Sequence, residues 1–143
     1  MNNKRALELL KKFLGEYEDR FIFHEQFLQE LTKLIISELN GNENDFYTLL
    51  TKQFKFIDST RENVHLTDRN EKLKNFPEGD WYSIRVKTKK VNVRLLIRFL
   101  KDHRPAFLVC FNEKSGKRVS GYEQYKNVVV NRFMEIKEEW ENE

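Results

Sequence analysis

The first third of the chain repeats its apolar residues at the spacing of an α-helix. Positions three or four apart along a helix share one face, and this pattern holds over residues 3–18, 24–39 and 45–54. Gly15 is the expected end or weak point of the first helix, because glycine disfavours a helix interior. Residues 56–80 are polar and irregular, so we expect at most a short strand or a single helical turn there.

From Trp81 onward the apolar residues alternate with other residues, as they do in strands. This alternation predicts strands over residues 81–88, 92–101 and 105–112, and helical spacing returns over residues 122–140. The third strand is apolar throughout, which is typical of a strand covered on both faces. The predicted fold class is therefore α+β, with N-terminal helices packed on a small antiparallel sheet and a closing C-terminal helix.

A chain of 143 residues is long enough for one domain with a substantial core, and no change in composition marks a linker. We therefore expect residues 1–143 to form a single domain. It divides into a helical portion (1–55), an irregular connection (56–80) and a portion that carries the sheet and the last helix (81–143).

The first two predicted strands form a hairpin, and the residues between its apolar positions are basic. Side chains alternate across a strand with period two, so the two sets point to opposite sides. If the strands pair, Arg85, Lys87, Arg94 and Arg98 share one face of the sheet. We expect the apolar face to pack against the helices and the basic face, Arg94 included, to be open to solvent.

The formal net charge of +3 conceals an asymmetry along the chain. Residues 81–133 contain 13 Lys and Arg against 3 acidic residues, whereas the remainder contains 13 Lys and Arg against 20 acidic residues. Such a division suggests an anionic partner for the second half, with nucleic acid the usual candidate. A basic surface that is merely solvated explains the charge count equally well.

Several classes of function find no support in the residues. Cys110 is the single cysteine and sits in an apolar run, so we expect a buried, inert thiol. The three histidines, His24, His65 and His103, lack metal-ligand spacing, and "KSGKR" lacks the upstream glycine of a phosphate loop. We expect no cofactor and no metal. No apolar run is long enough to span a membrane, and no secretion signal is evident, so we expect a soluble, cytoplasmic protein.

Residues 72–133 resemble the core of the RelE/ParE-type toxins of bacterial toxin–antitoxin modules. The resemblance rests on the order of four features: a leucine-bearing lead-in, "LKNFPEGDWYSIRV"; an arginine-bearing strand, "NVRLLIRFL"; an apolar strand leading into a lysine-rich loop, "LVCFNEKSGKR"; and a closing helix. The family is defined by this order more than by invariant residues. The resemblance implies a RelE-like fold and a metal-independent RNA endonuclease that commonly cuts messenger RNA on the ribosome.

The resemblance also implies which residues act. Arg94 falls at the position of the strand arginine, Lys117 stands for the loop cation and Tyr125 for the tyrosine near the last helix. Lys114 or Arg118 could replace Lys117, and Tyr122 could replace Tyr125. The implied catalytic set is Arg94, Lys117 and Tyr125, and the implied RNA-binding set is Arg85, Lys87, Arg98, Lys114, Arg118 and Tyr122. Ser83 stands where some members carry another lysine, which leaves the general base open.

Arginine suits this chemistry because its fixed positive fork matches phosphate oxygens. The resemblance further implies RNA and a cognate antitoxin protein as partners. A second resemblance, of "NVHLTDRNEKL" to nuclease-like domains grouped with barnase, EndoU, colicin and RelE-type folds, makes His65 an alternative acid or base, against a loop histidine with no role. The alternative function is a non-catalytic module on the same fold that binds nucleic acid or protein, as ParE-like gyrase inhibitors do.

Overall fold

A five-stranded mixed sheet forms the centre of the computed structural model, which describes residues 3–67, 69–77, 79–113 and 122–141. The strand order is β1-β5-β4-β3-β2. The strands are β1 (Ile22–Phe23), β2 (Glu71–Lys72), β3 (Tyr82–Lys87), β4 (Asn92–Phe99) and β5 (Pro105–Asn112). β1 pairs parallel with β5, and the other neighbouring pairs are antiparallel.

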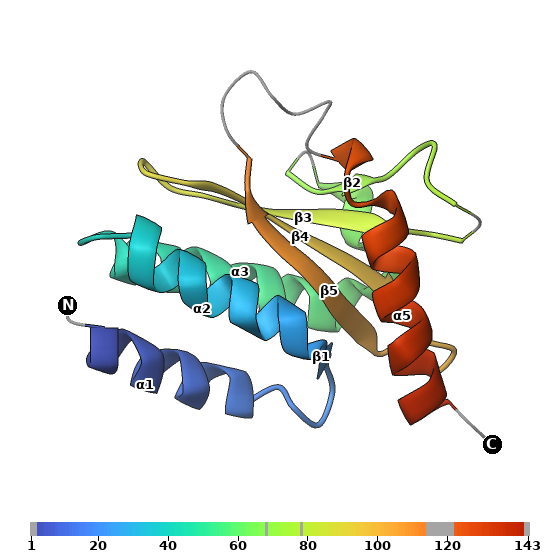
Figure 1. The fold of residues 1–143 in the computed structure, drawn as a ribbon, viewed down its shortest axis with the longest axis horizontal. Helices are drawn as coiled ribbons and strands as arrows, with labels where there is room; N and C mark the ends of the chain where they lie inside the picture. Colours follow the sequence, from blue (N-terminus) through green and yellow to red (C-terminus); the bar gives the residue numbers. More distant parts are fainter. Residues whose placement is uncertain (1–2, 68, 78, 114–121, 142–143) are drawn as a thin grey trace.

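Helices cover both faces of this sheet (Figure 1). Three helices lie on one face, with α2 and α3 next to the sheet and α1 packed beneath them, while α5 lies on the opposite face. The helical elements are α1 (Asn3–Gly15), α2 (Glu25–Glu38), α3 (Glu43–Thr60), the short 3-10 helix η1 (Arg61–Leu66) and α5 (Lys126–Trp140). The sheet is thus sandwiched between the N-terminal helices and the C-terminal helix.

The core on the α1–α3 side is rich in aromatic rings. Phe107 of β5 lies at its centre, with the rings of Phe21, Phe23, Phe27 and Phe54 at centroid distances between 5.0 and 5.4 Å. Full burial of one such side chain contributes about 1.5 to 3 kcal/mol to stability. These contacts hold the helical layer against β5, and residues of β3 and β4 belong to the same core.

A second, smaller core joins α5 to the other face of the sheet. Val129, Phe133 and Ile136 of α5 pack against a group of apolar residues that includes Leu96 and Leu108. A β-bulge contributes to this surface, because Leu96 pairs with Val109 and Ile97 with Phe107, so that Leu108 has no partner on β4. Through this irregularity Leu108 and Val109 both belong to the second core.

The spacing of apolar residues along the chain identified most of the helices and strands. The predictions of a helix over 24–39 and a strand over 105–112 are confirmed, and Gly15 does end α1. The helix predicted for 45–54 runs further, to Thr60, and the predicted closing helix begins four residues later than expected, at Lys126.

Two features of the fold correct the sequence prediction. The sheet is mixed instead of antiparallel, because β1 pairs parallel with β5. The connection 56–80 is also more ordered than expected, since it contains the end of α3, the helix η1 and the edge strand β2. The pairings of β1 with β5 and of β2 with β3 join separate segments, which local patterns do not encode.

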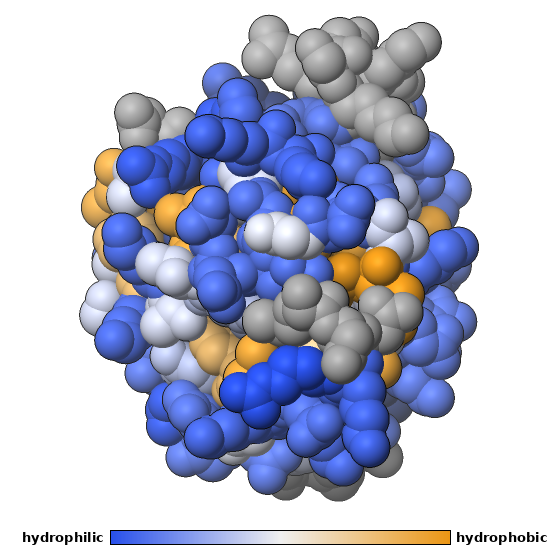
Figure 2. All heavy atoms as spheres, turned by 90° about the vertical axis from the view of Figure 1, so that its left-hand side faces the viewer, coloured by the Kyte–Doolittle hydropathy of each residue, from blue (hydrophilic) through white to orange (hydrophobic). Residues whose placement is uncertain are grey.

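The end of the molecule that carries the tip of the β3–β4 hairpin is mostly hydrophilic, with small apolar patches between polar side chains (Figure 2). Lys87, Lys89 and Lys90 are exposed at this tip. Among the described residues, no helix is both long and apolar enough to cross a membrane.

Candidate nucleic-acid interface

Arg85 and Arg94 stand directly opposite each other on β3 and β4. The turn between the strands sets this register: Thr88 N donates to the Val91 carbonyl at 2.8 Å, and the Thr88 hydroxyl accepts bonds from the amides of Lys90 and Val91. The two arginines therefore lie on one face of the sheet, as the alternation predicted. It is the face that α5 covers further along the strands.

The expectation that this face is open to solvent is wrong. Arg94 is only 9% exposed, and Leu96, two residues further along β4, is buried beneath α5. Arg98 lies with its guanidinium carbon 4.6 Å from the ring centroid of Trp81 and 4.5 Å from that of Phe133. Arg98 belongs to the α5 interface, roughly 13 Å along the strand from Arg94 at about 3.3 Å per residue.

A chain of polar side chains connects the two opposed arginines. Glu113, which follows β5 and is 8% exposed, lies with Oε1 3.4 Å from Arg94 Nε. The same oxygen accepts a bond from Asn92 Nδ2 at 3.1 Å, and Asn92 Oδ1 accepts one from Arg85 Nε at 3.2 Å. Like charges directly opposite in a sheet destabilise it, so the carboxylate and the amide offset their repulsion. Each guanidinium uses its Nε in this network.

Two tyrosines lie near this network, on the face of the sheet that α5 covers. The Tyr122 hydroxyl is 2.8 Å from the hydroxyl of Ser83, which is fully buried, and the guanidinium carbon of Arg94 lies 5.9 Å from the Tyr122 ring centroid. Tyr125 stacks on Phe111 of β5 at a centroid distance of 4.6 Å. The structure thus brings Arg85, Arg94 and Tyr122 together, with Tyr125 beside them.

Burial raises the pKa of Tyr122 to about 12, although the bond to Ser83 and the charge of Arg94 partly oppose the shift. Burial also raises the pKa of Tyr125, with the charge of Glu30 adding to the effect. Both hydroxyls are therefore neutral near pH 7. Neutral phenols donate a proton or a hydrogen bond, so Tyr122 fits the role of donor and not that of base.

This pKa predicts a loss of stability at alkaline pH. A tyrosine whose folded pKa lies above its unfolded pKa retains its proton longer in the folded state, so stability falls as pH rises from about 10. The decline should continue to about pH 12, where folded Tyr122 itself ionises. We expect Tyr122→Phe to reduce the slope of the melting temperature against pH across this window. An unchanged slope would show that Tyr122 does not titrate with a raised pKa.

The remaining predicted site residues lie apart or outside the described structure. Lys114, Lys117 and Arg118 fall within residues 114–121, which lie outside the described residues. Lys87 is exposed at the end of β3. His65 lies on the other side of the sheet, with its ring 5.7 Å from that of Tyr82, which belongs to the core beneath α1–α3. His65 is thus separated from the Arg94 cluster by the sheet.

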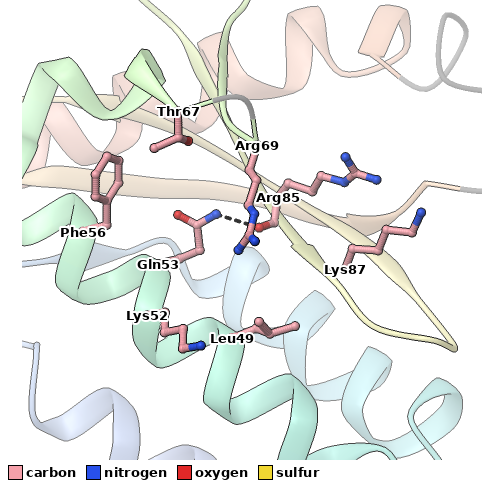
Figure 3. Close-up of a pocket in the computed structure, with 8 residues that line it drawn as sticks. All are labelled: Leu49, Lys52, Gln53, Phe56, Thr67, Arg69, Arg85 and Lys87. Carbon is pink, nitrogen blue, oxygen red and sulfur yellow. Dashed lines mark hydrogen bonds between the residues drawn. The ribbon is translucent and has the colours of Figure 1, made fainter.

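Sequence reasoning missed a basic cleft at the edge of β3. The cleft has a volume of about 590 Å³, and Lys52 of α3 and Arg69 of the segment before β2 line it together with Arg85 and Lys87 (Figure 3). It also missed Asn92 and Glu113, because neither follows the family pattern. The apolar spacing of α3 places Lys52 beside Leu49 and Phe56, but only the fold reveals that this side meets β3.

Comparisons of the chain with models of known protein families, with curated proteins and with solved structures found no match.

Proposed function

We propose that this protein is a metal-independent RNA endonuclease of the RelE-like toxin type. The observation that carries the proposal is the placement of Arg85 and Arg94 side by side on paired strands, next to a tyrosine that stays neutral at physiological pH. Strands hold charged groups more rigidly than loops do, and preorganised cations stabilise the negative charge that develops on a phosphate in the transition state.

The element order supports the RelE-like part of the proposal. The resemblance predicts an arginine-bearing strand, an apolar strand and a closing helix in sequence, and β4, β5 and α5 follow in this order. The parallel edge strand β1 and the helix α1 lie outside the segment that carries the resemblance.

In the proposed reaction, the RNA 2′-hydroxyl attacks the adjacent phosphorus and gives up its proton to solvent water, while a new P–O bond forms and the bond to the 5′-oxygen breaks. Arg94 and Arg85 hold the phosphoryl oxygens, and Tyr122 or Tyr125 donates the proton that the departing 5′-oxygen takes up. Ser83 is fully buried against Tyr122, so it is not the group that accepts the proton of the 2′-hydroxyl. Lys117 remains a proposed cation of the loop.

The proposal is tested by incubating the purified protein with RNA in EDTA and mapping the new 5′ ends. We expect cleavage that EDTA does not inhibit. We also expect RNA binding that weakens steeply between about 50 and 200 mM salt, because bound cations release counterions from the phosphates. Intact RNA at low salt, with the protein folded, would count against the endonuclease.

A second function is favoured by one observation. Arg94 is nearly buried and paired with Glu113, an arrangement that also suits a purely structural arginine in a non-catalytic binding module. Such a module would bind RNA or a protein and leave RNA intact. Expression in a bacterial host separates the two, because a free endonuclease of this type should slow growth until a cognate antitoxin, expected to be acidic, covers the basic surface.

A further inference from the structure

The cleft at the edge of β3 combines positive charge with an aromatic wall. Its four cations come from three segments of the chain: Lys52 from α3, Arg69 from the segment before β2, and Arg85 and Lys87 from β3. None of its described lining residues is acidic. Cations from separate elements that line one hollow attract an anion more strongly than the same cations scattered over a surface. Figure 3 shows Arg85 and Lys87 extending away from Phe56 and Thr67, so Lys52 and Arg69 are the cations considered for the ligand.

The strand edge that forms one wall is not available for pairing at Arg85. Asn70 Oδ1 accepts a bond from the Arg85 amide at 3.1 Å, and Gln53 Nε2 donates to the Arg85 carbonyl at 2.7 Å. Gln53 and Asn70 are themselves joined by two hydrogen bonds, at 2.9 and 3.1 Å. Because these amides occupy the backbone positions that an added strand would use, the cleft suits a compact ligand better than an extended peptide.

The two ends of the cleft differ in chemistry. Figure 3 shows Phe56 and Thr67 at one end, Lys87 at the other, and Arg69 directed toward Gln53 between them. Phe56 is half-buried, and Thr67 Oγ1 is a buried atom without a hydrogen-bond partner among the described residues. A ring that can stack and a hydroxyl that lacks a partner suit a flat, polar heterocycle, and the cations suit its phosphate.

We propose that this cleft binds a nucleotide, with the base on Phe56 next to the Thr67 hydroxyl and the phosphate between Lys52 and Arg69. Its volume of about 590 Å³ lies within the range of small-ligand sites, which is about 300 to 1,000 Å³. The nucleotide comes either from an RNA chain or from the free pool. The inference goes beyond the proposed function because it does not require that the protein cut RNA.

The test measures the dissociation constants of AMP, adenosine, inorganic phosphate and a short RNA oligonucleotide. We expect AMP to bind more tightly than adenosine or phosphate. Lys52→Ala and Arg69→Ala should each weaken AMP binding roughly tenfold, as expected for a hydrogen bond to a charged group.

Phe56→Leu keeps an apolar side chain in place but removes the stacking ring, and it should weaken the binding of AMP more than the binding of phosphate. Lys55→Ala, on an exposed position of the same helix outside the cleft, is the matched control and should bind AMP as before.

Binding of the oligonucleotide distinguishes the two sources of the nucleotide, an RNA chain and the free pool. If the nucleotide belongs to an RNA chain, Lys52→Ala and Arg69→Ala weaken the oligonucleotide and AMP together; if it is a free nucleotide, they weaken AMP alone. The inference is overturned if AMP does not bind, or if both variants bind AMP and the oligonucleotide like the wild type. A wild-type protein that cuts RNA but fails this test contradicts the cleft alone. One that binds AMP in the cleft but leaves RNA intact contradicts the endonuclease alone.

Discussion

Arg94→Met is expected to lower the free energy of unfolding by about 3 kcal/mol, the lower end of the range for breaking a buried ion pair. The side chains of Arg94 and Glu113 are 11% and 6% exposed, so the substitution leaves a carboxylate shielded from water without its cation. We expect a destabilisation at the lower end of this range because the ion pair has one contact, Arg94 Nε to Glu113 Oε1, at 3.4 Å. Chemical denaturation of the variant and the wild type measures this difference.

The double variant Arg94→Met/Glu113→Gln separates stability from chemistry. It leaves neither partner charged, and replacing both members of a buried pair is often neutral or stabilising. We therefore expect the double variant to recover most of the lost stability. Its RNA cleavage should stay reduced on the order of 100- to 1,000-fold, the usual cost of losing one preorganised donor.

Arg132 provides a matched control for these variants. It forms a second, partly buried pair between α5 and α2, with its Nη atoms 3.0 and 2.8 Å from the carboxylate oxygens of Glu30, and its Nη1 also donates to the Leu108 carbonyl. Arg132→Met should destabilise the protein at least as much as Arg94→Met and preserve cleavage per folded molecule. If the Arg94→Met/Glu113→Gln protein cuts RNA like the wild type, Arg94 only braces the sheet.

The spacing of apolar residues predicted a helix or strand where that spacing was regular and the element depended on contacts between residues close in the sequence. The end of α3 shows the limit. Asp58, Ser59 and Thr60 are typical of loops, yet the hydroxyls of Ser59 and Thr60 donate back to the Phe56 carbonyl, and Ile57 is fully buried in the core. The helix continues because tertiary burial outweighs the weak preference of three polar residues.

Strand β1 was not predictable from local sequence, because it consists of two residues paired with β5, more than 80 positions further along the chain.

The sequence predicted which side of the sheet carries the candidate site, but not that a helix and an ion pair would bury part of it. Period two correctly placed Arg85 and Arg94 on one side of the sheet. The same side also carries Leu96, which is fully buried and signals that a helix covers this face. The ion pair with Glu113 and the contribution of Lys52 to the cleft arise where separate elements meet, so no spacing within the sequence reveals them.

The most direct test of RNA cleavage by 2′-hydroxyl attack uses a defined oligonucleotide with one 2′-deoxynucleotide at a mapped cleavage position. Cleavage by this mechanism requires the 2′-oxygen as nucleophile, because Arg85, Arg94 and the neutral hydroxyl of Tyr122 supply the cations and the proton donor for this reaction.

In EDTA, the all-RNA substrate should yield a 2′,3′-cyclic phosphate and a 5′-hydroxyl at that position. The substituted substrate should remain intact there and still be cut elsewhere. Equal cleavage of the two substrates at the substituted position would contradict the account.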